Sequence, residues 1–222
     1  MIVFAPHPDD ETLGCGGTIA KRISEGYEVL VVLMTDGRFG LKIFGVDSDP
    51  TPEELKEIRR KEVQKALKIL GVPESNIFFL DFEDSSLKYN RKLVEAKVWA
   101  ILEKNPPVEV YFTSSEDLNL DHRATNWILL DALKKSEFEL AKYQYCINKK
   151  RDKFSRTKKS FLKLLRRDTV YVDISKYLHL KKSAINEFKS QITIMSNKQT
   201  EPALSSSFIC EHLKDHEVFD RI

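Results

Sequence analysis

The sequence predicts an α/β fold in which a mostly parallel sheet carries helices on both faces. Short apolar runs, rich in β-branched and aromatic residues, alternate with longer stretches of helical periodicity through the first two-thirds of the chain. The apolar runs are nearly continuous, which is typical of strands that are buried on both sides. This strand–helix alternation indicates right-handed βαβ units and therefore parallel strands.

The expected elements follow in chain order. Strands are expected at residues 1–5, 27–35, 76–82 and 108–114, and helices at 16–26, 51–71, 92–105 and 121–135. Beyond these, we expect strands at 138–147 and 168–175 and an amphipathic helix at 177–192.

The helix at 51–71 has the clearest boundaries. Thr51 is a favourable N-cap residue, and it is followed by Pro52 at the first helical position and by the acids Glu53 and Glu54. Gly71 is expected to end this helix.

The composition is typical of a soluble globular protein of one domain, spanning residues 1–222. Lys and Arg number 36 and Asp and Glu 34, which leaves a net charge of +2 and argues against a dedicated nucleic-acid binder. Cys15, Cys146 and Cys210 lie far apart, so we expect reduced thiols in a cytoplasmic protein. We expect neither a signal peptide nor a membrane span.

One segment is strongly basic. Residues 148–167, "NKKRDKFSRTKKSFLKLLRR", contain many cations and one acid, with apolar side chains between them. The segment could recruit an anionic substrate or contact a membrane surface. The alternative, which we favour, is a solvated amphipathic excursion whose apolar side joins the core.

Polar residues that follow two of the strands point to a site. His7, Asp9 and Asp10 come directly after the first strand, and the segment 114–122 follows the fourth. In an open parallel sheet, ligands bind beyond the carboxyl ends of the strands, so these segments are expected to converge. Buried carboxylates are costly unless they are paired or bound to a cation.

His7, Asp10 and His122 provide the three N and O donors that a catalytic zinc needs, with a fourth position open for water. Adjacent residues in a turn point in different directions, so Asp9 would stay free to take a proton from the metal-bound water. We therefore expect a Zn²⁺ site, or a site for another divalent cation.

Other interpretations of these residues remain open. "HPDD" could be an ordinary turn in which Asp9 or Asp10 caps the next helix, and Asp121 could be the N-cap of the helix that follows it. His122 could also be a surface histidine.

A dinucleotide loop at Gly14, Gly16 and Gly17 is rejected. Its match to GxGxxG is poor, and two aspartates would repel the pyrophosphate.

The segment "APHPDDETLGCGG" resembles the signature of the LmbE-like, or PIG-L, family of zinc-dependent N-deacetylases. Weaker similarities continue in the family's order along the chain: "LMTDGRFG", "IRRKEVQKALKILGV", "DLNLDHRATN", "KKSAINEFKSQI" and "HEVFDRI". The resemblance implies a Rossmann-like fold and metal-assisted removal of an N-acetyl group, usually from glucosamine or a glucosamine conjugate.

The resemblance also implies roles for individual residues. His7, Asp10 and His122 would be the metal ligands and Asp9 the general base. Arg59, the first residue of an R-x-x-E pattern, would contact the substrate beyond the sugar; alternatively, it is a solvated arginine paired with Glu62.

One position departs from the family pattern. The family's H-x-D-H segment places a histidine where this chain has Asn119, so Asp121 lacks its usual partner two residues earlier. An amide can donate a hydrogen bond to an oxyanion but cannot deliver a proton as an imidazolium does. That proton would come from Asp9, or from His212 or His216.

We therefore expect catalysis by Asp9, Asn119 and Asp121 on a small amino-sugar substrate that could be anionic, in a homo-oligomer that binds no nucleic acid. Two other functions stay open. One is metal-dependent cleavage of a non-sugar amide, and the other is a catalytically silent sugar-binding homologue, prompted by Asn119.

Overall fold

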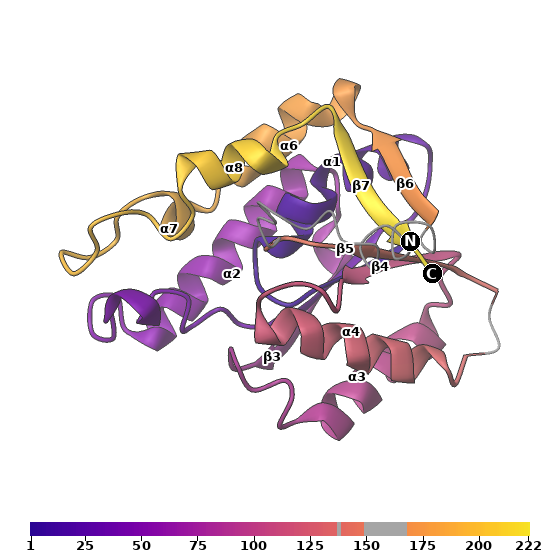
Figure 1. The fold of residues 1–222 in the computed structure, drawn as a ribbon, viewed down its shortest axis with the longest axis horizontal. Coiled ribbons are helices and arrows are strands. Elements are labelled where there is room, and N and C mark those ends of the chain that lie inside the picture. Colours follow the sequence, from indigo (N-terminus) through magenta and orange to yellow (C-terminus); the bar gives the residue numbers. More distant parts are fainter. Residues whose placement is uncertain (137–138, 149–167) are drawn as a thin grey trace, which may run out of the picture.

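Seven strands form one sheet in the computed structural model, which describes residues 1–136, 139–148 and 168–222 (Figure 1). The spatial order of the strands is β3-β2-β1-β4-β5-β7-β6. Their bounds are Ile2–Ala5 (β1), Leu30–Thr35 (β2), Ile77–Phe82 (β3), Glu109–Thr113 (β4), Ala141–Tyr145 (β5), Asp168–Asp173 (β6) and His216–Arg221 (β7). The strands from β1 to β5 pair in parallel, whereas β7 is antiparallel to both β5 and β6. The order 3-2-1-4-5 is that of a Rossmann-like sheet, so the predicted fold class is confirmed.

The first strand explains the continuous apolar runs. All four residues of β1 are buried. Val3 and Ala5 belong to one hydrophobic core, and Ile2 and Phe4 belong to another on the opposite face, because successive side chains of a strand alternate. A strand with a core on each face needs apolar residues at every position.

Helices cover both of these cores. The main helices are α1 (Asp10–Ser24), α2 (Pro52–Ile69), α3 (Arg91–Lys104), α4 (Leu120–Leu133) and α6 (Leu178–Ile185). Helices α1, α2 and α6 pack together over one face of the sheet, and α3 and α4 pack together over the other (Figure 1). The smaller helices are α7 (Lys189–Ile192), α8 (Ser206–His212), and the short turns η1 (Lys42–Phe44), η2 (Glu74–Asn76) and η3 (Ser175–Tyr177).

The predicted boundaries of α2 agree with the structure. The Thr51 side chain accepts a hydrogen bond from the backbone N–H of Glu54, and the Glu54 carboxylate accepts one from the backbone N–H of Thr51. This reciprocal capping box satisfies two helix donors that would otherwise lack a partner.

Helix α1 begins earlier than predicted, at Asp10 instead of residue 16. The glycines that were rejected as a dinucleotide loop lie inside this helix, and bulky side chains lie against two of them. A Cβ atom on Gly14 would stand 2.4 Å from the ring of Tyr145, and one on Gly17 would stand 2.4 Å from Ile174. The glycine-rich sequence is therefore a packing requirement.

The C-terminal part differs from the prediction in two places. The helix expected at 177–192 is broken into η3, α6 and α7, and the strand β7 was not predicted. Strand β7 lies between β5 and β6, the two strands that were predicted in this part of the chain, and pairs with both.

Two buried polar contacts attach this C-terminal part to α1 and α2. The Lys181 ammonium lies 2.6 Å from a Glu217 carboxylate oxygen, and that carboxylate also accepts from the backbone N–H groups of Gly17 and Thr18. Glu62 accepts from the backbone N–H and the hydroxyl of Ser190. Three of the weaker family-like segments thus contact one another across the fold.

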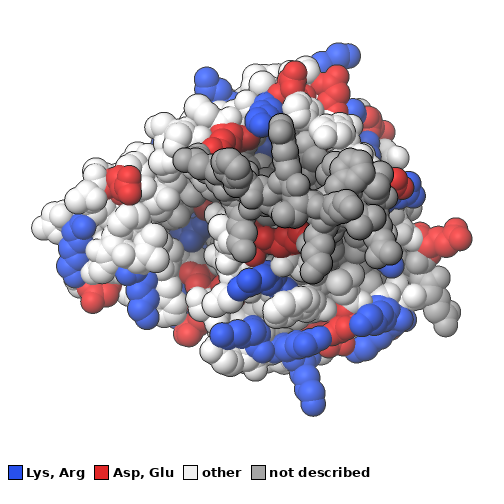
Figure 2. All heavy atoms as spheres, viewed as in Figure 1, with Lys and Arg blue, Asp and Glu red and all other residues white. Residues whose placement is uncertain are grey.

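Charge is mixed on the face of the molecule that Figure 2 shows. Figure 2 shows Lys and Arg side chains along the lower rim, over α3 and α4, with acidic side chains among them.

Of the basic segment 148–167, only residue 148 lies within the described residues, so its predicted roles are not addressed by the structure. No helix in the described part of the chain is both long and apolar enough to cross a membrane.

Candidate active site

The carboxyl ends of β1 and β4 bring together three side chains that we call the metal triad: His7, Asp10 and His122. His7 follows β1, Asp10 opens α1, and His122 lies in the first turn of α4. One donor atom from each residue lies within 4.8 Å of the other two. The predicted convergence of the two loops is therefore found.

The triad's geometry suits a divalent cation. His7 Nδ1 and His122 Nε2 each lie 3.0 Å from the same Asp10 oxygen, Oδ2, and 3.2 Å from each other. The outer nitrogen of each ring faces another carboxylate: His7 Nε2 is 3.2 Å from Asp121 Oδ2, and His122 Nδ1 is 3.0 Å from Asp117 Oδ2. Protons on the outer nitrogens leave two lone pairs and one carboxylate facing inward, which is the donor set of a catalytic zinc site.

The electrostatics of the triad agree with cation binding. Burial alone would lower the pKa of His122, but the nearby carboxylates of Asp10 and Asp117 raise that pKa to about 9. Burial would raise the pKa of Asp10, yet the two histidines hold it well below its usual range. The site therefore attracts positive charge strongly, and a metal ion can take the place of those protons.

Asp9 lies next to the triad in the same cavity and is not a member of it. Its backbone has φ 149°, which is rare for any residue except glycine, and its N–H donates to Glu11 Oε2 over 3.1 Å. Its carboxylate accepts a hydrogen bond from Arg59. The Asp10 carboxylate instead contacts His7 and His122. Burial raises the pKa of Asp9 to about 7, and the nearby Asp10 charge adds to this increase while Arg59 opposes it.

Arg59 is buried, with 3% of its surface exposed. Its Nη2 donates to Asp9 Oδ2 over 3.0 Å and to the Pro8 carbonyl over 2.7 Å, and its Nη1 donates to the Gly37 carbonyl over 3.2 Å. Its Nε is buried without a hydrogen-bond partner among the described residues. The interpretation of Arg59 as a solvated arginine paired with Glu62 is wrong, because Glu62 bonds to Ser190 and Arg59 bonds to Asp9.

Asn119, not Asp121, is the N-cap of α4. The Asn119 side-chain oxygen accepts from the Asp121 N–H over 2.8 Å. This corrects the alternative that made Asp121 the cap. The Asp121 carboxylate accepts instead from the Ser85 N–H over 2.6 Å, in addition to its contact with His7. The N-x-D spacing at a helix start was the signal that could have identified the cap.

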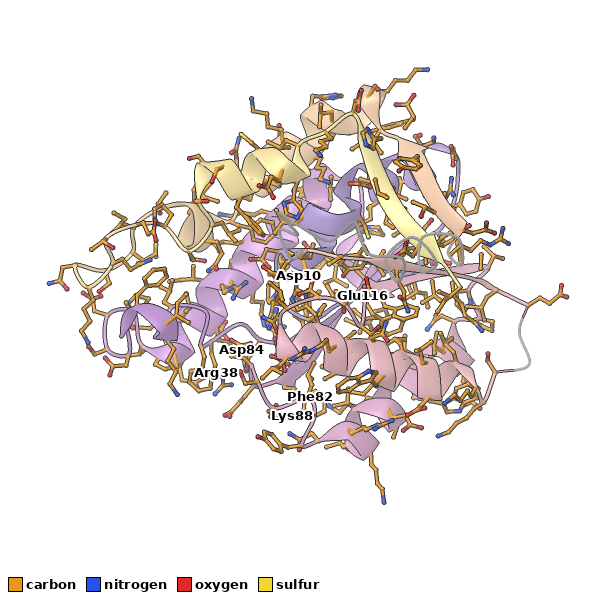
Figure 3. All side chains as sticks on the ribbon, viewed as in Figure 1. Asp10, Arg38, Phe82, Asp84, Lys88 and Glu116 are labelled. Carbon is orange, nitrogen blue, oxygen red and sulfur yellow. The ribbon has the colours of Figure 1, made fainter. Side chains whose placement is uncertain are left out.

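Three residues at the site were missed by the sequence analysis: Asp84, Ser85 and Asp117. Asp84 accepts from the backbone N–H groups of Gly37 and Phe39, so it fixes the loop after β2. Figure 3 shows Asp84 beside Arg38, on the loops that follow β3 and β2, with Asp10 nearer the centre of the molecule. No sequence signal marks the loop after β3, since its contacts depend on the sheet order.

A cavity of about 590 Å³ joins these groups. Polar groups of the triad, Asp9, Arg59, Asp84, Asn119 and Asp121 form part of its wall. Other parts of the wall are apolar and come from the loop after β2 and from the segment around α8, namely Phe39, Ile43, Ala203, Leu204 and Phe208. His212 and His216, suggested as proton donors, line a neighbouring pocket and not this cavity.

A model of the PIG-L family, described as GlcNAc-PI de-N-acetylase, matches residues 2–133, which is more than half of the chain. The chain belongs to the PIG-L family. The matched residues include the whole metal triad, Asp9, Arg59 and the start of α4.

Two curated proteins similar to this PIG-L chain are deacetylases by name. The chain is 35% identical over 108 residues to the diacetylchitobiose deacetylase of Thermococcus kodakarensis, covering 49% of this chain and 38% of that protein. It is 30% identical over 138 residues to a probable N-acetyl-alpha-D-glucosaminyl L-malate deacetylase 2 of Bacillus anthracis, covering 60% and 58%. The matches thus span less than two-thirds of the length of these relatives.

The fold is also similar to that of a solved structure, the N,N'-diacetylchitobiose deacetylase from Pyrococcus horikoshii complexed with its inhibitor MPG. The TM-score is 0.73 at 26% identity, and the similarity covers 100% of this PIG-L chain and 82% of that chain. The similarity therefore extends beyond residues 2–133 into the C-terminal part.

Proposed function

We propose that this chain is a metal-dependent hydrolase that removes the N-acetyl group from N-acetylglucosamine or a conjugate of it. The observation that carries the proposal is the metal triad with an independent buried carboxylate, Asp9, on the wall of the same cavity. Family membership and the named activities of the relatives support the choice of an N-acetyl amino sugar.

His7, Asp10 and His122 would hold the metal ion, for which we propose Zn²⁺. A bound zinc lowers the pKa of water to roughly 7 and polarises a carbonyl. The two nitrogens and one carboxylate oxygen of the triad match the ligands that zinc prefers.

Asp9 would act as the general base. Its raised pKa suits a group that must accept a proton near neutral pH and return it. Because no histidine stands at position 119, Asp9 is the group that we assign to deliver the proton to the leaving amine. The Arg59 guanidinium fixes the carboxylate in place for both steps.

Asn119 and Asp121 would act in different ways. The Asn119 oxygen is used in the helix cap, so its amide N–H₂ is the group that could donate to the developing oxyanion. Asp121 would stabilise the orientation of His7. We retain Arg59 as a substrate contact because it lines the cavity, in addition to its bond with Asp9.

The group attached to the sugar would lie against the apolar part of the cavity wall. Phe39 and Leu204 are half-buried there, and Ile43 is 82% exposed, so these side chains can gain contact with a ligand. An apolar or aromatic substituent would bury this surface.

Acetate release from metal-loaded protein tests the proposal, using N-acetylglucosamine, diacetylchitobiose and a panel of other N-acetylglucosamine conjugates. We expect release that stops when the metal is removed with a chelator and returns with Zn²⁺. Binding without turnover would favour the catalytically silent homologue suggested by Asn119. Neither binding nor turnover would favour a non-sugar amide.

Asp9→Asn separates the base from the metal site. We expect this variant to retain the wild-type metal content, measured by elemental analysis, and to lose turnover. Activity that survives the substitution would contradict the role of Asp9 as base.

A further inference from the structure

Asp117 lies directly behind the metal triad. Its Oδ2 is 3.0 Å from His122 Nδ1, the ring nitrogen that faces away from Asp10. The side chains of both residues are buried, with 0% of the Asp117 side chain and 1% of the His122 side chain exposed. The Nδ1–H is not aligned on this oxygen and has no other hydrogen-bond partner among the described residues. The Asp117 carboxylate is therefore the acceptor that the structure offers to it.

The position of Asp117 is itself tightly fixed. Its Oδ2 accepts from the backbone N–H groups of Ile147 and Asn148 over 2.9 and 3.0 Å. Its Oδ1 accepts from the Asn119 N–H over 2.9 Å and from the Asn148 side chain over 3.3 Å. These donors compensate the buried carboxylate and fix it relative to the end of β5 and the start of α4.

A carboxylate in this position selects one tautomer of the imidazole. Since a carboxylate only accepts, it favours the proton on Nδ1 and leaves the Nε2 lone pair free toward Asp10 and His7. The other histidine of the triad has the same arrangement with the roles of its nitrogens exchanged, because His7 Nε2 faces Asp121 and His7 Nδ1 faces inward. Such outer carboxylates orient metal-binding histidines.

We propose that Asp117 is a positioning residue of the metal triad, which holds His122 in the Nδ1–H tautomer so that Nε2 can bind the metal ion. The inference rests on the proposed function only in requiring that the triad bind a divalent cation. Asp117 would act through His122 and would not contact the substrate.

Zn²⁺ affinity of the purified full chain tests this role, measured by competition with a chelator. Asp117→Asn keeps the size of the side chain but removes one acceptor oxygen, and we expect roughly 10- to 100-fold weaker Zn²⁺ binding. Glu62→Gln is the matched control. Glu62 is also a buried carboxylate that accepts from a backbone N–H and a second donor, and it binds Ser190 far along the chain from the triad.

We expect Glu62→Gln to keep the wild-type Zn²⁺ affinity, even if both variants unfold at lower temperature. Equal Zn²⁺ affinity of Asp117→Asn and wild type would overturn the inference. Equal losses in the two variants would also overturn it, since they would reflect a general effect of destabilisation. Failure of the wild-type chain to bind Zn²⁺ would contradict the proposed function itself, and the inference with it.

A measurement on the wild type covers the case in which Asp117→Asn does not fold. In the ¹H–¹⁵N spectrum of the Zn²⁺-loaded protein, we expect His122 to carry its proton on Nδ1 and to show metal-bound Nε2. A His122 ring protonated on Nε2 would overturn the inference.

Discussion

Arg59 and Asp9 form a buried ion pair, with the Nη2 of Arg59 3.0 Å from the Oδ2 of Asp9. Asp9 is 9% exposed at its side chain and Arg59 3%, so the pair is poorly screened by solvent. The same guanidinium binds two backbone carbonyls, which links α2 to the loops after β1 and β2.

Removing the Arg59 charge should shift the pH dependence of activity. Arg59 lowers the pKa of Asp9 against the effect of burial, so Arg59→Met should raise that pKa. A base must be deprotonated, and the acidic limb of kcat/KM should therefore move to higher pH. Arg59→Lys is the control, because it keeps the charge and should leave the limb near its wild-type position. If the acidic limb of kcat/KM does not move in Arg59→Met, Arg59 does not set the pKa of Asp9.

Glu11 should make the metal-free protein less stable as the pH rises. Burial raises the pKa of Glu11 from 4.5 to about 8, and the Asp9 charge contributes. A folded-state pKa above the unfolded value favours the protonated folded protein, so stability is fully present below pH 4.5 and is lost as the pH rises toward about 8. The free energy of unfolding, measured in urea at a series of pH values from 4.5 to about 8, should fall as the pH rises. We expect this fall to be smaller in Glu11→Gln. Parallel pH curves for the two proteins would contradict the prediction.

Two neighbouring glycines of α1 should respond oppositely to alanine. Gly17→Ala would place a Cβ 2.4 Å from Ile174, and overpacking of this kind costs about 1–3 kcal/mol. A Cβ on Gly16 would lie 3.2 Å from the Lys181 side chain and at ordinary contact distances, 3.5 and 3.7 Å, from Thr12 and Leu70, so only a small shift is needed and the higher helix propensity of alanine, up to about 1 kcal/mol, should dominate. The free energies of unfolding measured in urea should therefore fall for the first variant and rise, or stay level, for the second.

Ile43 should matter only for substrates with an apolar group on the sugar. Ile43→Ser removes exposed apolar surface from the cavity wall, which should raise KM for an aryl or alkyl glycoside of N-acetylglucosamine. The KM for N-acetylglucosamine itself should not change, and this provides the internal control. An equal rise in KM for both substrates would show that Ile43 does not contact the apolar group.

The metal triad could be predicted from the sequence because its position depends on a general property of parallel sheets. His7 follows β1 and His122 follows β4, and these two strands are neighbours in the sheet. Asp117 and Ser85 could not be assigned in this way. Their roles depend on which loops face each other and on individual hydrogen bonds, and neither is encoded by hydrophobic periodicity.

The glycines of α1 show a second limit of sequence reasoning. Glycine has a low helix propensity, yet Gly14 and Gly17 lie inside a helix. Glycine is needed at these positions because Tyr145 and Ile174 occupy the space that larger side chains would fill. Both partners lie more than a hundred residues away in sequence. Arg59 is a similar case, since its partner Asp9 comes from another element and not from its own helix.

The backbone of Asp9 has a consequence for how this position can change. Its φ of 149° is in a region that glycine adopts readily and aspartate rarely does. Backbone strain of this kind typically costs about 1–3 kcal/mol of stability. Selection for thermal stability alone should therefore favour glycine at position 9, whereas selection for turnover should retain the aspartate. The two demands compete at a single residue.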